Sequence, residues 1–390
     1  MPIYNRIAEF HDDMTEWRHD IHAHPELCFE EHRTSKIVAE KLESWGIEVH
    51  TGLAKTGVVG VLRGQGNSTR TVGLRADLDA LPMQEANDFH YKSIHDGKMH
   101  ACGHDGHTIM LLGAARYLSE NKNFDGTVHF IFQPAEEGGG GAKVMIDEGL
   151  FDRFPCDQVY GMHNYSSTPA GTFSIRPNAF MASADSCKIT INGVGGHAAW
   201  PNKCIDPIAI GVQLHTSLQT IISRNTNPVR QAVLSITQFH GGSANNVISD
   251  TAQLDMSIRA LDNETRAMIR RRVFEISEGI AKANGIEITV EYEDGYPVLV
   301  NDPRHMEIAA DIAASIVGEQ KVDREADYIL GSEDFAFMLE EKPGAYIFLG
   351  QADDQHTAQL HQTEYDFNDD VSTIGASFWA AMVEQSMPRE

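Results

Sequence analysis

Short apolar strands alternate with helical segments along the first 183 residues, and this alternation limits the possible folds more than any other feature of the sequence. Apolar residues recur at helical spacing over residues 3–22, again from about residue 34, and over residues 108–118. Short runs rich in β-branched and aromatic residues predict strands at residues 58–62, 71–75, 127–132 and 158–162. Such alternation is typical of an α/β fold, in which helices cover the faces of a sheet.

The pattern changes near residue 183. Residues 185–192 alternate polar and apolar side chains, as a strand with one solvent-exposed face does. The expected order from there is strand, helix, strand, strand, helix, strand, which is the ferredoxin-like arrangement, and the α/β pattern resumes after Pro297. The sequence therefore predicts two domains. They are a discontinuous, mixed-sheet α/β domain of residues 1–183 and 299–390, and an inserted ferredoxin-like α+β domain of residues 184–298.

The charge of the chain argues against several classes of partner. Asp and Glu number 56 against 31 Lys and Arg, which gives a formal net charge of −25 at pH 7. Because nucleic acids and anionic membrane surfaces require concentrated Lys and Arg, neither is expected as a partner. The first residues show no apolar signal core and no run of 18 apolar residues occurs, so we expect a cytoplasmic protein. Five scattered cysteines without a CxxC pair agree with a reducing compartment.

The densest group of metal-binding side-chain types lies at residues 100–107, with the sequence His-Ala-Cys-Gly-His-Asp-Gly-His. Mixed thiolate and imidazole donors suit zinc and its first-row neighbours, whereas calcium and magnesium prefer oxygen donors alone. Gly103 and Gly106 favour a tight loop, and a helical pattern begins directly afterwards at Thr108. We therefore expect these donors at a loop-to-helix junction.

Two adjacent glutamates, Glu136 and Glu137, follow the strand predicted at residues 127–132 and precede four glycines. Neighbouring side chains at a strand end point in different directions, so one carboxylate could bind a metal while the other faces a substrate. The alternative interpretation is an acidic turn exposed to solvent.

Two further histidines, His163 and His361, each close an apolar segment. Either one alone is more often a structural residue than a ligand. Together with Cys102, His104 and one glutamate they would make five protein ligands. That number is too large for one tetrahedral ion and suits two metals that share a ligand.

The chain resembles the M20 metallopeptidase family, and within it the amidohydrolase branch that contains hippurate hydrolases, N-acyl-amino-acid aminoacylases and auxin-conjugate hydrolases. The matching motifs run through nearly the whole chain in order, and they are His24-Pro-Glu-Leu27, Arg75-Ala-Asp-Leu-Asp-Ala-Leu-Pro82, His100-Ala-Cys-Gly-His-Asp-Gly-His107, Gln133-Pro-Ala-Glu-Glu-Gly138, Gly195-Gly-His-Ala-Ala199, Asn245-Asn-Val-Ile248, Gly331-Ser-Glu-Asp-Phe335 and Leu360-His361. The resemblance implies a metallopeptidase catalytic domain, an inserted lid that also mediates dimer contacts, and a homodimer.

Carried over motif by motif, the resemblance implies two divalent metal ions per chain, which could be zinc, manganese, cobalt or nickel. It implies Glu136 as the general base, and it makes Asp77 and Asp105 the partners that orient ligand imidazoles. We expect His107 to be structural. Each implied metal ligand supplies a sulfur, imidazole or carboxylate donor. These ligands are Cys102, His104, Glu137, His163 and His361.

The inserted domain is expected to supply three residues that contact the substrate. The resemblance implies His197 as an oxyanion donor at the scissile carbonyl, either within the chain or across the dimer. It implies Asn246 and Arg259 on the substrate's α-carboxylate, the arginine through a bidentate pair. The alternative for Arg259 is a surface ion pair with Asp262 or Glu264.

These implications predict a dinuclear metal-dependent amidohydrolase that removes an acetyl- or benzoyl-type acyl group from an amino acid with a free carboxylate. A metallopeptidase acting on dipeptides or small peptides is the alternative within the same chemistry. Two other classes stay open. One is a thiol enzyme with Cys102 as nucleophile, and the other is a catalytically silent protein that keeps the fold for binding or dimerisation.

Overall fold

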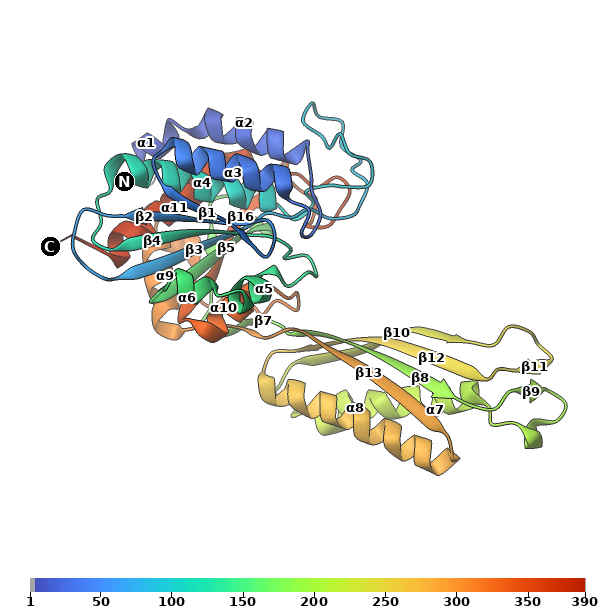
Figure 1. Cartoon of the computed structure of the whole chain (residues 1–390). Helices are drawn as coiled ribbons and strands as arrows, with labels where there is room; N and C mark the ends of the chain where they lie inside the picture. Colours follow the sequence, from blue (N-terminus) through green and yellow to red (C-terminus); the bar gives the residue numbers. More distant parts are fainter. Residues whose placement is uncertain (1–3, 390) are drawn as a thin grey trace. The chain divides into compact units, whose positions relative to one another are not determined.

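The computed structural model describes residues 4–389 and divides the chain into two compact units (Figure 1). The second unit comprises Ala179–Leu299 together with Tyr328–Glu333, and the rest of the chain forms the first unit. The chain crosses from the first unit to the second within β7 (Asn178–Met181) and returns within β14 (Leu299–Asn301). Residues Tyr328–Glu333 belong to the second unit although the residues on either side belong to the first. The local sequence pattern does not predict this assignment.

An eight-stranded mixed sheet forms the centre of the first unit, with the strand order β1-β2-β4-β3-β5-β16-β6-β15. The strands are β1 (Glu48–Leu53), β2 (Gly57–Arg63), β3 (Thr71–Asp77), β4 (Thr127–Gln133), β5 (Gln158–Pro169), β6 (Phe173–Ser174), β15 (Val322–Asp323) and β16 (Gly344–Ala352). β3 runs parallel to β4 and β5, and β16 runs parallel to β5, whereas β2 is antiparallel to β1 and β4. This confirms the predicted mixed-sheet α/β fold.

Helices lie on both faces of this sheet, with α2, α3 and α4 on one side and α5, α6 and α10 on the other (Figure 1). The helices of the unit are α1 (Asn5–Ala8), α2 (His11–His22), α3 (His32–Ser44), α4 (His104–Asn121), α5 (Gly141–Asp147), α6 (Leu150–Arg153), α9 (Pro303–Val317), α10 (Phe335–Glu341) and α11 (Ser372–Ser386). The single helix expected at residues 3–22 is divided into α1 and α2, and residue 3 lies outside the described residues. No helix between residues 4 and 389 is long and apolar enough to cross a membrane.

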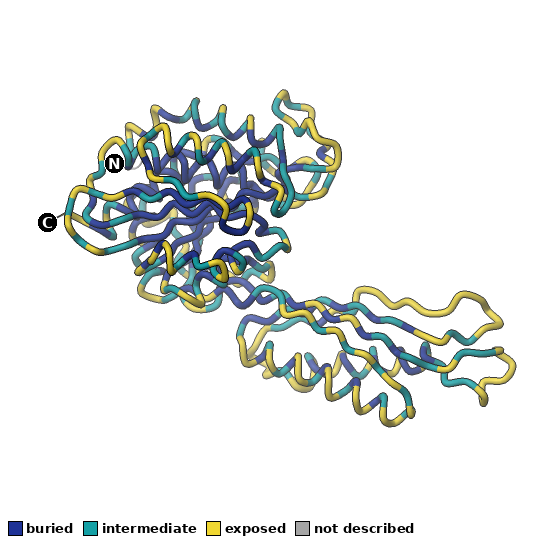
Figure 2. The backbone as a smooth tube through the Cα atoms, viewed as in Figure 1, coloured by how far each residue is buried: buried dark blue, intermediate teal, exposed yellow. Residues whose placement is uncertain are grey.

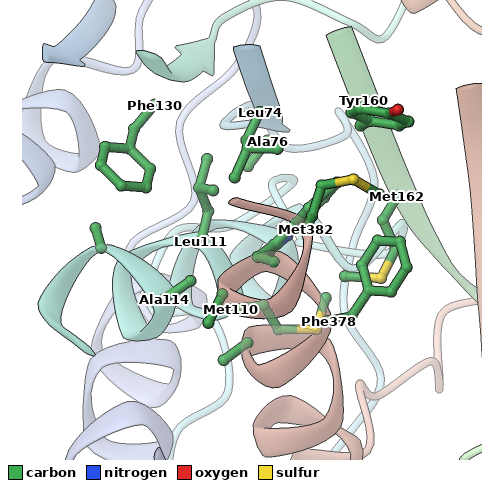
Figure 3. Packing of buried hydrophobic residues seen from close by; sticks show 14 of the residues in the cluster. Leu74, Ala76, Met110, Leu111, Ala114, Phe130, Tyr160, Met162, Phe378 and Met382 are labelled. Atoms are coloured by element: carbon green, nitrogen blue, oxygen red, sulfur yellow. The ribbon is translucent and has the colours of Figure 1, made fainter. Parts of the chain in front are cut away.

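Helix α4, which follows the predicted metal-binding motif, is deeply buried. Its residues from His104 to Ala115 are all buried, because the helix is apolar on nearly every side and packs between the sheet and α11. Figure 3 shows Met110 and Leu111 of α4 beside Leu74 of β3 and Phe378 of α11. The packing fixes the position of the α4 N-terminus, where the metal-binding motif lies.

The second unit is a four-stranded antiparallel sheet with the order β10-β12-β8-β13. Helices α7 and α8 pack on one face, and buried residues alternate with more exposed ones along β8 and β12 (Figures 1 and 2). In chain order the elements are β8 (Ala184–Asn192), α7 (Pro207–Thr220), β10 (Ala232–Gly241), β12 (Thr251–Ala260), α8 (Asn263–Asn284) and β13 (Glu287–Tyr296). The first strand lies between the third and the fourth, which is the ferredoxin-like topology.

Candidate metal centre

All five predicted metal ligands belong to the first unit, near the carboxyl ends of its parallel strands. His163 lies in β5 beyond the last residue that pairs with β3, and Glu137 follows β4. His104 is the first residue of α4, Cys102 precedes it, and His361 follows β16. The carboxyl ends of parallel strands meet at one edge of a sheet, and open α/β sheets bind their ligands there.

Helix α4 begins at His104, four residues earlier than predicted, because Gly103 ends the preceding loop. Gly103 has φ of 89°, in the left-handed region that favours glycine. A Cβ at this position would lie 2.3 Å from the Asn164 Oδ1 atom and 2.6 Å from the Tyr365 hydroxyl. The glycine therefore permits both the turn and the close approach of neighbouring side chains to the motif.

The donor atoms form two groups that share one thiol. Cys102, His104 and His163 offer donors that all lie within 4.8 Å of one another, and so do Cys102, Glu137 and His361. The Cys102 Sγ atom is 3.4 Å from His163 Nε2, and the His361 Nε2 atom is 3.2 Å from Glu137 Oε1. Two neighbouring three-donor groups with a common sulfur can hold two metal ions in adjacent positions.

His104 provides the test of whether this group of residues fits a metal. Its Nε2 atom is buried and has no hydrogen-bond partner among the described residues, and a buried polar atom left in that state is costly. Its Nδ1 atom is 2.9 Å from the Asp79 carbonyl oxygen and 3.3 Å from Asp79 Oδ1. Donation from Nδ1–H to Asp79 leaves Nε2 free to bind a metal, so the donors fit one.

Asp79, rather than Asp77, holds a ligand imidazole by hydrogen bonds. Asp77 Oδ1 lies 2.6 Å from His107 Nδ1, Asp77 Oδ2 accepts from Arg75 at 2.6 Å, and the nearest His104 nitrogen is 3.7 Å away. Burial would raise the pKa of Asp79, but the hydrogen bond and charge of His104, together with the Glu137 N–H group and the Cys28 thiol, outweigh burial and hold that pKa below its usual range. Asp79 therefore stays an ionised acceptor. Asp79 lies two residues after Asp77, and side chains two residues apart in an extended chain point to the same face. That spacing could have identified Asp79 from the sequence.

His107 lies between Asp77 and Asn164. The Asn164 backbone N–H donates to His107 Nε2 at 3.0 Å. Asp77, His104 and His107 also present donor atoms within 4.8 Å of one another. Both Asp77 and His107 are already engaged by protein partners, which fits the expected structural role of His107 better than direct ligation.

Asp105 does not contact any candidate ligand imidazole, which corrects the role predicted for it. Its Oδ2 atom accepts from His22 Nδ1 at 2.9 Å and from Arg18 at 3.2 Å. The reason is helical geometry, since consecutive residues of a helix point about 100° apart. In α4, His104 therefore faces the donor group while Asp105 faces α2.

His22 is enclosed by two carboxylates and carries a pH-dependent part of the stability. Its Nδ1 contacts Asp105 at 2.9 Å and its Nε2 contacts Glu85 at 3.1 Å. Burial would lower the pKa of His22, but the two carboxylates outweigh it and raise that pKa to about 9. The folded state therefore binds more protons than the unfolded state between about pH 6.5 and pH 9. The stabilisation, roughly 3 kcal/mol, is complete below that window and is lost as the pH rises through it.

We expect the unfolding temperature of the wild type to fall more steeply between pH 6.5 and pH 9 than that of His22→Gln, because the variant lacks the titrating ring. Thermal unfolding in excess chelator at several pH values measures this difference. His24→Gln is the matched control, since His24 lies in a partly exposed bend just beyond the end of α2 and its Nδ1 contacts the Asp20 carbonyl oxygen. Equal slopes for wild type and His22→Gln would contradict the prediction.

Cys102 is a poor candidate for a nucleophile. Burial, together with the carboxylates of Glu137, Glu136 and Asp77, raises the pKa of the Cys102 thiol well above its ordinary value. Burial also lowers the pKa of His163, the imidazole 3.4 Å from the sulfur. A thiolate–imidazolium pair, which a thiol enzyme needs, is therefore disfavoured. This favours the interpretation of Cys102 as a metal ligand.

The predicted substrate-binding residues lie in the second unit. His197 is exposed in β9 (Gly196–His197), which pairs with β11 (Val247–Ile248), and the Ala198 N–H donates to the Asn246 carbonyl oxygen at 3.0 Å. Arg259 lies near the end of β12 and donates to Ser332 Oγ at 3.1 Å. No ion pair joins Arg259 to Asp262 or Glu264 among the described residues, and Asp262 instead pairs with Arg230 and caps α8.

Asn246 and Arg259 are not brought together within one chain. Asn246 lies before Thr251, the first residue of β12, and Arg259 lies eight residues beyond Thr251. Eight residues of an extended strand span roughly 26 Å. Figure 1 shows β9 and β11 at one end of the sheet of this unit. One carboxylate cannot contact Asn246 and Arg259 of the same copy.

Known proteins resemble this chain in sequence and in structure over nearly its whole length. The sequence profile of Peptidase family M20/M25/M40 matches residues 73–385. The chain is 44% identical to a hippurate hydrolase of Campylobacter jejuni over 98% of each chain, and 40% identical to thermostable carboxypeptidase 2 of Saccharolobus solfataricus over 95% of each. The structure is also similar to that of the YXEP protein of Bacillus subtilis, described as a dinuclear metal binding peptidase. The TM-score is 0.85, with 32% identity and coverage of 97% of this chain and 98% of that one.

Proposed function

The chain belongs to Peptidase family M20/M25/M40 and is a metal-dependent amidohydrolase, and from this premise we propose that it hydrolyses N-acyl amino acids with a free carboxylate. The observation that carries the proposal is the pair of donor groups joined by Cys102. The similarity to a hippurate hydrolase supports an acyl group of acetyl or benzoyl type, because hippurate is a benzoyl amino acid.

Glu136 is the general base of the proposed reaction. Two divalent ions, zinc, manganese, cobalt or nickel, held by the five ligands would polarise the attacking water and the amide carbonyl. The Glu136 carboxylate takes a proton from the water and passes it to the leaving amine nitrogen. Its position supports this role, since Glu136 is 7% exposed and has an oxygen within 4.8 Å of donors of His104 and Glu137.

We propose that the second unit acts as a lid that supplies His197 to the carbonyl oxygen, and Asn246 and Arg259 to the α-carboxylate. A chain with net charge −25 needs a local cation of this kind to bind an anionic substrate. Because Asn246 precedes the start of β12 and Arg259 lies near the end of that strand, both can contact one substrate only if two copies of the chain contribute.

This requirement supports a homodimer. β10 is an edge strand of the second unit, five of its residues in a row are exposed, and its Phe239 is 37% exposed. An uncovered strand edge can pair with a second copy of the chain. Gel filtration is expected to give the mass of two chains, and a monomer would contradict the contribution of a second copy.

Hydrolysis of a substrate panel tests the proposed activity. The panel contains N-acetyl and N-benzoyl amino acids and dipeptides, assayed with metal-free protein and after addition of zinc, manganese, cobalt or nickel. We expect metal-restored cleavage of the acyl amino acids, with kcat/KM at least about tenfold above that for dipeptides, a difference of roughly 1.4 kcal/mol in transition-state stabilisation. Faster cleavage of dipeptides would favour the alternative, a metallopeptidase, which the similarity to a carboxypeptidase supports. Metal binding without any hydrolysis would favour the catalytically silent protein.

A further inference from the structure

Two buried carboxylates hold the loop that carries the base and its neighbouring ligand. The loop lies between β4 and α5 and has no regular secondary structure at residues 134–140. Three consecutive N–H groups of its backbone donate to carboxylates. The Ala135 N–H donates to Glu31 Oε1 at 2.9 Å, the Glu136 N–H to Asp79 Oδ1 at 3.0 Å, and the Glu137 N–H to Asp79 Oδ2 at 2.9 Å. Glu31 is 0% and Asp79 1% exposed, so water does not compete for these bonds.

Glu31 accepts hydrogen bonds from two backbone residues whose own φ angles are unfavourable. Ala135 has φ of 55° and Phe29 has φ of 62°, and both angles lie in the left-handed region that residues other than glycine avoid. The N–H groups of both residues donate to the same Glu31 Oε1 atom, each at 2.9 Å. The Thr56 hydroxyl donates to the other oxygen, Oε2, at 2.5 Å. Such backbone geometry persists only where its surroundings hold it, and Glu31 provides that hold.

Asp79 joins the same loop to the metal-binding motif. Besides the N–H groups of Glu136 and Glu137, its carboxylate contacts His104 Nδ1 at 3.3 Å and the Cys28 thiol at 3.2 Å. One side chain thus sets the positions of a ligand imidazole, the ligand Glu137 and the base Glu136 relative to one another.

We propose that Glu31 and Asp79 are positioning residues that fix the general base Glu136 relative to the metal ligands His104 and Glu137. This inference rests on the proposed function. Neither carboxylate needs to touch the substrate or a metal. Their effect passes through three backbone N–H groups and one imidazole, and a displacement of the base by about 1 Å is enough to cost on the order of 100-fold in rate.

The two carboxylates differ in a way that makes the proposal testable. Both Asp79 oxygens accept backbone N–H groups, so Asp79→Asn must place an amide NH₂ against one of these donors. Glu31→Gln can keep its oxygen on the Ala135 and Phe29 N–H groups and donate from its nitrogen to the Thr56 hydroxyl, which can accept. Glu31→Met has about the same size and cannot accept a strong hydrogen bond.

The experiment compares these variants in the full-length, metal-loaded protein. Metal affinity is measured by competition with a chelator, kcat and KM on the best N-acyl amino acid, and stability by thermal unfolding. We expect Asp79→Asn to lower metal affinity by about 10- to 100-fold, as loss of a partner of a ligand imidazole does. We expect Glu31→Met to lower kcat by about 10- to 100-fold at saturating metal with KM nearly unchanged, and Glu31→Gln to restore kcat.

Glu26→Gln is the matched control. The two Glu26 oxygens accept the consecutive N–H groups of Arg33 and Thr34 at the start of α3, at 2.9 and 2.8 Å. The same kind of substitution therefore removes a carboxylate that accepts no N–H group of the loop at residues 134–140. We expect a lower unfolding temperature with metal affinity and kcat unchanged.

Two outcomes would overturn the inference. One is an Asp79→Asn protein that, like Glu26→Gln, loses only stability, and the other is a Glu31→Gln protein as slow as Glu31→Met. If Asp79→Asn does not fold, the two Glu31 variants decide. If the wild type hydrolyses no acyl amino acid, the proposed function fails separately, and a fall in the metal affinity of Asp79→Asn still supports the positioning role.

Discussion

Glu136→Gln is expected to lower kcat by about 10²- to 10⁴-fold while metal content stays near the wild-type value. The amide cannot take a proton from water, yet it has nearly the shape of the carboxylate. Glu136 also lies outside the two donor groups that share Cys102, although its carboxylate is close to His104 and Glu137. Steady-state kinetics and elemental analysis of the purified variant measure the two effects separately.

Glu137→Gln is the matched comparison, since it makes the same substitution one residue along the chain. The Glu137 carboxylate belongs to one donor group with Cys102 and His361, and its Oε1 atom is 3.2 Å from His361 Nε2. We expect this variant to lose metal as well as turnover. Equal metal loss in the two variants would show that the roles of the glutamates are wrongly assigned.

Cys102→Ala is expected to weaken binding at both metal positions, because Cys102 is the donor common to both groups. Loss of a direct ligand should exceed the effect of losing an outer partner, so each affinity should fall by more than about 100-fold. His163→Ala and His361→Ala each remove a donor from only one group. Titration of metal-free protein should therefore show one position weakened in each histidine variant and both weakened in Cys102→Ala.

Cys156→Ala provides the control for removal of a thiol. Cys156 is buried and its Sγ atom is 3.4 Å from His129 Nδ1, the same sulfur-to-nitrogen distance as between Cys102 and His163. It takes no part in the two donor groups, so metal binding should be unchanged. If Cys102→Ala weakened only one position, a shared thiol would be refuted.

The positions of strands and helices could be predicted because secondary structure depends mainly on residues that are close in the sequence. Short apolar runs at residues 71–75, 127–132 and 158–162 predicted strands, and β3, β4 and β5 begin at the first residue of these runs. The start of α4 was less predictable. It depends on Gly103 packed against Asn164 and Tyr365, which lie far away in the sequence.

The sequence by itself determined the kinds of donor, the order of the motifs and the family to which the chain belongs. The tertiary structure alone decided which of the three aspartates Asp77, Asp79 and Asp105 orients a ligand imidazole. It also decided that Glu31 reaches the backbone at Ala135, 104 residues away in the sequence. The physical reason is that a hydrogen bond requires the donor–acceptor distance to be correct to within a few tenths of an ångström and the side chain to point in the right direction. Local patterns specify the direction of a side chain relative to its own helix or strand, and only the packing of distant segments specifies what that side chain meets.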